Sequence, residues 1–88
     1  MIKFEIKPEL YKKLVKLSKK DKKSYEAVMR KIDEVVNSSS IEHYKNLRFN
    51  MKDSKRVHVG HFVLIFSYDP SRDFIFFEDY DHHDNIYK

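Results

Sequence analysis

The sequence predicts an α+β fold: an N-terminal strand, a two-helix antiparallel hairpin, and a C-terminal three-strand meander. Apolar residues recur at helical spacing in the first half of the chain, whereas β-branched and aromatic residues dominate runs in the second half. Helices followed by a block of strands are typical of α+β folds. We therefore expect the helix pair to pack on one face of a mainly antiparallel sheet and to leave the other face partly open.

The first half of the chain carries the predicted strand and both helices. Residues 2–7 alternate apolar and charged side chains, and Pro8 suits the first turn of a helix, where its missing N–H is not needed. Helical spacing follows on either side of a turn at residues 18–21, in which Ser18 or Asp21 could cap the second helix. The apolar positions are Leu10, Tyr11, Leu14, Val15 and Leu17, then Tyr25, Val28, Met29, Ile32, Val35 and Val36.

The second half predicts the meander. Three β-rich runs cover residues 57–59, 62–68 and 74–79. The single glycine predicts a hairpin turn at Gly60-His61, and Pro70 suits the second position of a turn between the last two strands. We expect the polar residues after the third run to form a solvated tail.

Composition limits the class of protein. Eighty-eight residues allow one domain, residues 1–88, and 41% hydrophobic content is too high for a disordered chain. No apolar run approaches ~18 residues, and Lys3, Glu5 and Lys7 interrupt any signal peptide, so we expect no membrane span and no leader. The absence of cysteine excludes disulfides and Cys-containing zinc sites and suggests the cytoplasm.

Charge is unevenly distributed along the chain. The formal net charge is +4, but residues 1–31 carry eleven Lys and Arg against four acidic residues, whereas residues 32–88 carry seven against ten. A basic half suggests a polyanionic partner, with nucleic acid first. The alternative is a solvated, lysine-rich helix face.

Strand alternation separates two polar residues from their apolar neighbours. If Val57 and Val59 face the helices, Arg56 and His58 stand side by side on the uncovered face. A guanidinium suits phosphate, and an imidazole can exchange a proton near neutral pH. The alternative is an edge strand whose polar side is simply wet.

Other polar and aromatic residues have weaker signals. Asp81-His82-His83-Asp84 suggests a metal-dependent nuclease or sensor, but adjacent histidines on a strand or turn point apart, and we expect no metal site. Tyr80 and Tyr87 suit either base stacking or closing the end of the core. His43 is expected to lie on a surface loop.

Three segments together resemble a known family. They are residues 44–48, the run from Lys55 through the glycine turn to Phe66, and the end of the chain from Phe77 to Tyr87. They resemble the RelE-type toxins, which are ribosome-dependent messenger-RNA interferases of type II toxin–antitoxin systems. The order of strand, two helices and meander also agrees, so the resemblance covers essentially the whole chain.

The resemblance implies a function and a set of partners. Such a toxin cleaves messenger RNA in the ribosomal A site by making the ribose 2′-OH the nucleophile, without metal or other cofactor, and so inhibits translation during stress. Its partners would be the ribosome, messenger RNA and a RelB-like antitoxin, in a complex for which a heterotetramer is one form. DNA would be contacted only indirectly, through the antitoxin complex, and no membrane is involved.

The resemblance also assigns residues. Arg56 and His58 fall on two basic strand positions, His83 on the position of an arginine that follows a histidine, and Tyr87 on a terminal tyrosine. Arg56 would hold the phosphate, His58 or Tyr87 would move the proton, and His83 would add charge. Further contacts to RNA or the ribosome would come from Arg48, Lys55, Lys12, Lys16, Lys19 and Lys23.

Two positions depart from the family pattern. Val63 stands where many members carry an arginine that contacts the scissile phosphate, and His83 makes its charge conditional on pH. Losing one such cation could cost ~2–4 kcal/mol of transition-state stabilisation. The toxin would then be slow, would recruit another cation such as Lys55 or Arg72, or would act by binding the ribosome or the antitoxin alone.

Overall fold

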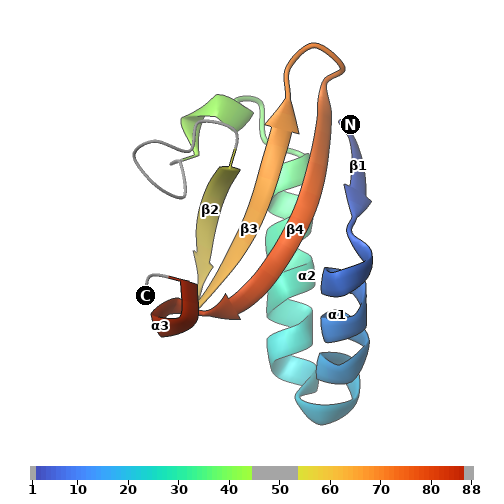
Figure 1. Cartoon of the computed structure of the whole chain (residues 1–88), viewed down its shortest axis with the longest axis vertical. Helices are drawn as coiled ribbons and strands as arrows, with labels where there is room; N and C mark the ends of the chain where they lie inside the picture. The colour runs from blue at the N-terminus through green and yellow to red at the C-terminus, as the bar shows by residue number, and fades with distance from the viewer. Residues whose placement is uncertain (1, 45–53, 87–88) are drawn as a thin grey trace.

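The computed structural model describes residues 2–44 and 54–86. Its strands lie in the order β1-β4-β3-β2, with β1 parallel to β4 and the other two pairs antiparallel (Figure 1). This arrangement confirms the predicted α+β fold and its mainly antiparallel sheet. The elements are β1 (Lys3–Ile6), α1 (Pro8–Lys20), α2 (Lys22–Val36), the 3₁₀ turn η1 (Ile41–His43), β2 (Ser54–Val59), β3 (Phe62–Asp69), β4 (Phe74–His82) and α3 (His83–Ile86).

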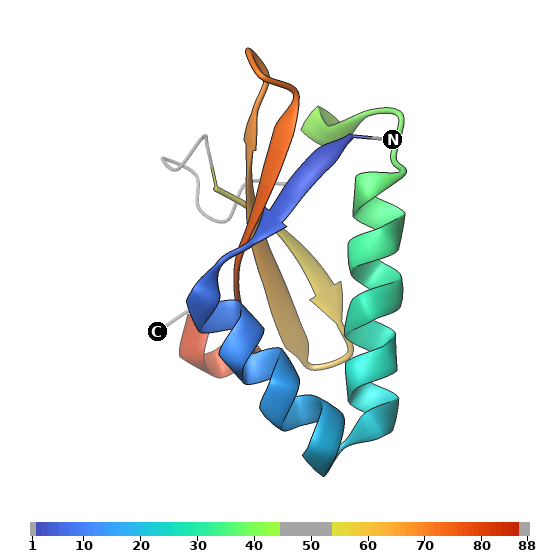
Figure 2. The same cartoon turned by 90° about the vertical axis from the view of Figure 1, so that its right-hand side faces the viewer.

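A single residue joins the two long helices. Asp21 ends α1 and caps α2, where its carboxylate accepts hydrogen bonds from Ser24 N at 3.2 Å and from Ser24 Oγ at 2.7 Å. Ser18, the other predicted cap, instead donates to the carbonyl oxygen of Val15. The helices diverge from this junction (Figure 2), and no described helix is long and apolar enough to cross a membrane.

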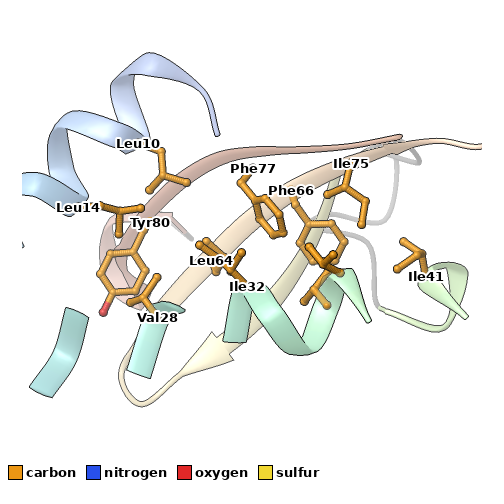
Figure 3. Close-up of a cluster of buried hydrophobic side chains, with 12 residues drawn as sticks. Leu10, Leu14, Val28, Ile32, Ile41, Leu64, Phe66, Ile75, Phe77 and Tyr80 are labelled. Atoms are coloured by element: carbon orange, nitrogen blue, oxygen red, sulfur yellow. The ribbon is translucent and has the colours of Figure 1, made fainter. Parts of the chain in front are cut away.

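The hydrophobic core lies between the helix pair and the sheet (Figure 3). Burying each large apolar side chain of this kind contributes about 1.5–3 kcal/mol, so the core holds the sheet firmly against the helices. Its members are Leu10, Leu14, Val28, Ile32, Val35, Val36, Ile41, Leu64, Phe66, Ile75, Phe77 and Tyr80.

The meander follows the predicted turns, but its end differs from the prediction. Gly60 adopts a φ of 64° in the two-residue turn between β2 and β3, a conformation that suits glycine. The predicted solvated tail is wrong, because β4 continues to His82 and α3 follows it. Tyr80 pairs with Leu64 of β3, and its ring enters the core. The alternation of buried and exposed side chains along β4 therefore continues beyond Asp79.

The turn between β3 and β4 holds a carboxylate whose ionisation stabilises the fold. Asp69 accepts hydrogen bonds from the N and Oγ of Ser71, at 3.0 and 2.7 Å, and from Nε of Arg72 at 2.8 Å. The Ser71 hydroxyl first, and then Arg72, lower the pKa of Asp69 from 3.8 to about 2. Because the folded state binds this proton less tightly than the unfolded state, the stabilisation is complete above pH 3.8 and is lost as the pH falls towards 2.

We therefore expect the variant Asp69→Asn to have a lower Tm than the wild type at neutral pH. The difference in Tm should shrink as the pH falls from 3.8 towards 2, because the wild-type carboxyl group becomes neutral as well. Thermal unfolding followed by circular dichroism at a series of pH values measures this. A difference that stays constant over the whole range contradicts the assignment.

Candidate functional site

Strand pairing places two predicted site residues on the face of the sheet that the helix pair does not cover. Val57 and Val59 pack against the core, so Arg56 and His58, which alternate with them on β2, project from the opposite face. Neighbours of like orientation on one strand are about 7 Å apart along it, which is close enough for both to reach one phosphate. His58 is exposed and Arg56 is half-buried.

The last helical turn brings a third predicted residue to the same place. Figure 2 shows α3 on the side of the sheet opposite α2. The imidazole rings of His58 and His83 meet edge to face, with their centroids 5.7 Å apart. The imidazoles of His58 and His83, which are 25 positions apart in the sequence, thus lie together, and Arg56 is the next residue of like orientation on β2. The structure brings His83 to His58, which is the neighbour of Arg56 on the same face of β2; the catalytic roles of these three residues stay predictions.

An open hollow of about 430 Å³ lies against β2. The described residues that line it are Arg56, Val57 and His58 of β2, together with His43 and Tyr44. His43 is exposed, and its ring lies edge to face with that of Tyr44. The sequence placed His43 on the surface correctly but gave no signal that it faces this hollow, since a short 3₁₀ turn has no periodicity that fixes its orientation.

Lys55 lies apart from the cluster. It is 8% exposed, and its Nζ donates to the carbonyl oxygen of Tyr44 at 3.3 Å. It alternates with Arg56 and therefore projects from the other face of β2. The prediction that Lys55 contacts RNA gains no support from this placement.

The remaining predicted contacts fall into two groups. Arg48 and Tyr87 lie outside the described residues, so their roles stay predictions. The four lysines of the helix pair that were predicted to contact RNA are all exposed, and the three on α1 point away from the buried Leu10 and Leu14. They are Lys12, Lys16, Lys19 and Lys23.

The two adjacent histidines at the end of β4 point to different neighbours, as predicted. The ring of His82 packs against Phe62, with centroids 5.3 Å apart, and stacks near His61, whereas His83 turns towards His58. Within residues 2–44 and 54–86, no three His, Cys, Asp or Glu side chains gather as a metal ion would require. The Asp81–Asp84 segment thus offers no ready-made set of ligands.

Val63, the position that departs from the family pattern, is completely buried. It lies directly between His58 on β2 and Asp81 on β4, and α3 contacts β3 and β4. The face opposite the helix pair is therefore accessible along β2 but covered at this point of β3. Valine here is a packing residue, and the permanent positive charge beside it comes from Arg56.

Comparison with curated proteins identifies close relatives in archaea. The chain is 48% identical over 89 residues to a Methanocaldococcus jannaschii protein described as "Putative toxin RelE4", with 100% of the chain and 93% of the relative aligned. It is 46% identical over 84 residues to an uncharacterised Methanosarcina mazei protein, with 94% of the chain and 95% of that protein aligned. No family model matches the chain.

Solved structures have the same fold at low sequence identity. The isolated Escherichia coli RelE toxin matches 93% of the chain and 84% of its own length, with a TM-score of 0.75 and 18% identity. The RelE of the Pyrococcus horikoshii RelE–RelB complex matches 92% of this chain and 93% of its own, with a TM-score of 0.67 and 15% identity. From the shared fold, and from 48% identity over the full chain to RelE4, we conclude that this protein belongs to the RelE family of toxins.

Proposed function

We propose that this protein is the toxin of a type II toxin–antitoxin system and acts in the cytoplasm as a ribosome-dependent endoribonuclease. It would cleave messenger RNA in the ribosomal A site without metal, and so stop translation. The observation that carries the proposal is the cluster of Arg56, His58 and His83 on an accessible face, beside a hollow of about 430 Å³. The relationship to RelE toxins supports the substrate class.

The proposed reaction needs three contributions, which these residues can supply. A base removes the proton of the ribose 2′-OH, the resulting oxygen attacks the adjacent phosphorus, and the bond to the 5′-oxygen breaks as that oxygen gains a proton. The products are a 2′,3′-cyclic phosphate and a 5′-hydroxyl. His58 would move the proton, Arg56 would hold the charged phosphate, and His83 as an imidazolium would add positive charge. Tyr87 remains a second candidate for the proton transfer.

The test uses purified ribosomes programmed with a short message. Wild-type protein should cut the message at the A-site codon and should leave the same message intact when ribosomes are omitted. The double variant Arg56→Ala, His58→Ala should not cut. No cleavage by the wild type, or undiminished cleavage by the double variant, would overturn the proposal.

The proposed antitoxin is RelB-like. The solved relatives include RelE bound to RelB from Pyrococcus horikoshii and the YoeB–YefM complex from Staphylococcus aureus. β2 lies at one edge of the sheet, so its outer side can accept an added strand. On α1, Tyr11 and Val15 lie one turn apart and are 61% and 37% exposed, which offers apolar contact to a helix. Co-expression of a RelB-like protein encoded beside this chain should restore growth.

The exposed lysines of the helix pair are proposed to hold ribosomal RNA. Replacing Lys12 and Lys16 together by alanine should weaken ribosome binding and reduce the slope of log affinity against log salt by about 2, one for each phosphate contact removed. Lys31→Ala is the control, because Lys31 pairs with Glu34 at 3.1 Å on α2. Filter binding of labelled protein to ribosomes over a salt series measures both slopes. An unchanged slope in the double variant contradicts the proposed contact.

A second candidate function rests on the burial of Val63. With no cation at that position, a protein that arrests growth by occupying the ribosome without cutting RNA is the competing proposal. Growth arrest in cells whose messages show no new 5′ ends would favour it. Growth arrest accompanied by A-site cuts would exclude it.

A further inference from the structure

The element that carries His83 is too short to hold itself in place. α3 contains four residues, His83–Ile86, which form about one helical turn. Helices of this length have no stability of their own in water. Its first three side chains are exposed and only Ile86 is partly buried, so apolar burial contributes little to its position. Specific polar contacts of the described residues therefore help to place it on the sheet.

Two backbone contacts fix the start of α3. The N–H of His83 donates to the carbonyl oxygen of His61, in the β2–β3 turn, at 2.9 Å. The N–H of Asp84 donates to Nδ1 of His82 at 3.2 Å, so the side chain of His82 caps the turn. These bonds fix the path of the backbone at the end of β4.

A side-chain bond ties α3 to the end of β4. Nδ2 of Asn85 donates to Oδ1 of Asp81 at 3.0 Å, and the same oxygen accepts from the N–H of His82 at 2.7 Å. The hydrogen bond from Asn85 is the largest of the causes that hold the pKa of Asp81 below its ordinary value. Asp81 is therefore a charged acceptor, and such hydrogen bonds are stronger than neutral ones.

The same carboxylate is linked to the helix pair. Nζ of Lys13, on α1, lies 2.6 Å from Oδ1 of Asp79 and 3.7 Å from Oδ2 of Asp81. It also donates to the carbonyl oxygen of Tyr80 at 3.3 Å. Lys13 thus spans the end of β4 between the two carboxylates. Asp81 is thus contacted by Lys13 of α1 through one carboxylate oxygen and by Asn85 of α3 through the other.

We propose that Asp81 and Asn85 are positioning residues, which lock α3 onto the sheet and so keep the imidazole of His83 against that of His58. The catalytic consequence rests on the proposed function, whereas the geometric claim does not. Neither residue touches the hollow, so each acts through His83. Weakening the bond should separate the two rings and slow RNA cleavage, while the affinity for the ribosome stays the same.

The first test measures the proximity of the two rings in the free protein, without a ribosome. Rings at 5.7 Å should give a nuclear Overhauser effect between ring protons of His58 and His83. Asn85→Asp places a second carboxylate against Asp81, so this signal should disappear while the Tm changes little. The control is Asn37→Asp, because Asn37 makes the same kind of bond to Asp33 Oδ1, at 3.1 Å, on α2. The control variant should keep the signal.

The second test exchanges the two partners. In the double variant Asp81→Asn, Asn85→Asp, the amide and the carboxylate change places and one hydrogen bond can form again. This exchanged variant should show the signal between the rings once more. On programmed ribosomes, Asn85→Asp should reduce the single-turnover cleavage rate at least tenfold without weakening ribosome binding, and the exchanged variant should regain much of that rate.

The outcomes separate the two claims. If Asn85→Asp retains the signal between the rings, the positioning role is wrong, whatever happens to cleavage. If the signal disappears in Asn85→Asp and returns in the exchanged variant, while the wild type itself cuts no RNA, the positioning role is correct and the proposed function fails. Absence of the signal from both variants contradicts the role of the Asp81–Asn85 bond.

Discussion

Arg56→Ala is expected to slow cleavage of messenger RNA on programmed ribosomes about 100- to 1,000-fold. The reason is electrostatic, because the oxygens around the phosphorus carry their greatest negative charge in the transition state. Removing one fixed donor aimed at such a charge lowers the rate of an enzyme by about this factor. Arg56 is the arginine of the described residues that lines the hollow, and Val63, opposite the neighbouring His58, provides no second cation. Single-turnover cleavage with saturating ribosomes measures the effect on the chemical step.

The matched control is Arg30→Ala. Arg30 is exposed on α2, which packs on the other face of the sheet, so its loss removes the same charge from the protein without touching the cluster. It should change the rate by less than about threefold, because a distant exposed charge is largely screened by salt. Equal rates for the two variants would mean that Arg56 contributes only to the overall charge.

Phe66→Ala is expected to lower the free energy of unfolding by about 3–5 kcal/mol, because it empties a large space in a close-packed core. Phe66 is completely buried at the centre of the core in Figure 3. Its ring contacts Phe77, with centroids 5.9 Å apart, and Tyr44, with centroids 5.5 Å apart. Urea unfolding followed by circular dichroism measures the change. A loss of this size would use up much of the stability of a domain this small.

Phe62→Ala is the control for that measurement. Phe62 is 38% exposed at the rim, where it stacks on Tyr80 with centroids 4.9 Å apart. Its removal leaves a surface depression that water can fill, so the loss of stability should be clearly smaller. If the two variants lose the same stability, the core is not organised around Phe66 as the structure shows.

The fold could be predicted from the sequence because its elements have local signals. Alternation of apolar and charged residues marks β1, helical spacing and Asp21 mark the helix pair, and Gly60 marks the turn of the meander. Each signal depends on a few neighbouring residues. The end of β4 was missed because residues 79–82 are mostly polar: they alternate between the two faces there, and only Tyr80 enters the core.

The candidate site could be predicted only in part. Alternation alone places Arg56 and His58 on the accessible face, whereas the approach of His83 depends on a helical turn held by Asp81 and Asn85. No local sequence pattern predicts that two segments so far apart in the chain approach each other. The burial of Lys55 was missed for a related reason, since its acceptor is the carbonyl oxygen of Tyr44, eleven residues away in the chain.

The most direct test of the central claim removes a single 2′-hydroxyl group from the message. Ribosomes are programmed with a message that has 2′-deoxyribose at the nucleotide preceding the scissile phosphate, and with the matching all-ribose message. The wild-type protein should cut the all-ribose message to give a 2′,3′-cyclic phosphate and a 5′-hydroxyl, and should leave the deoxy message intact. Cleavage of both messages at equal rates would contradict attack by the 2′-OH at the cluster of Arg56, His58 and His83.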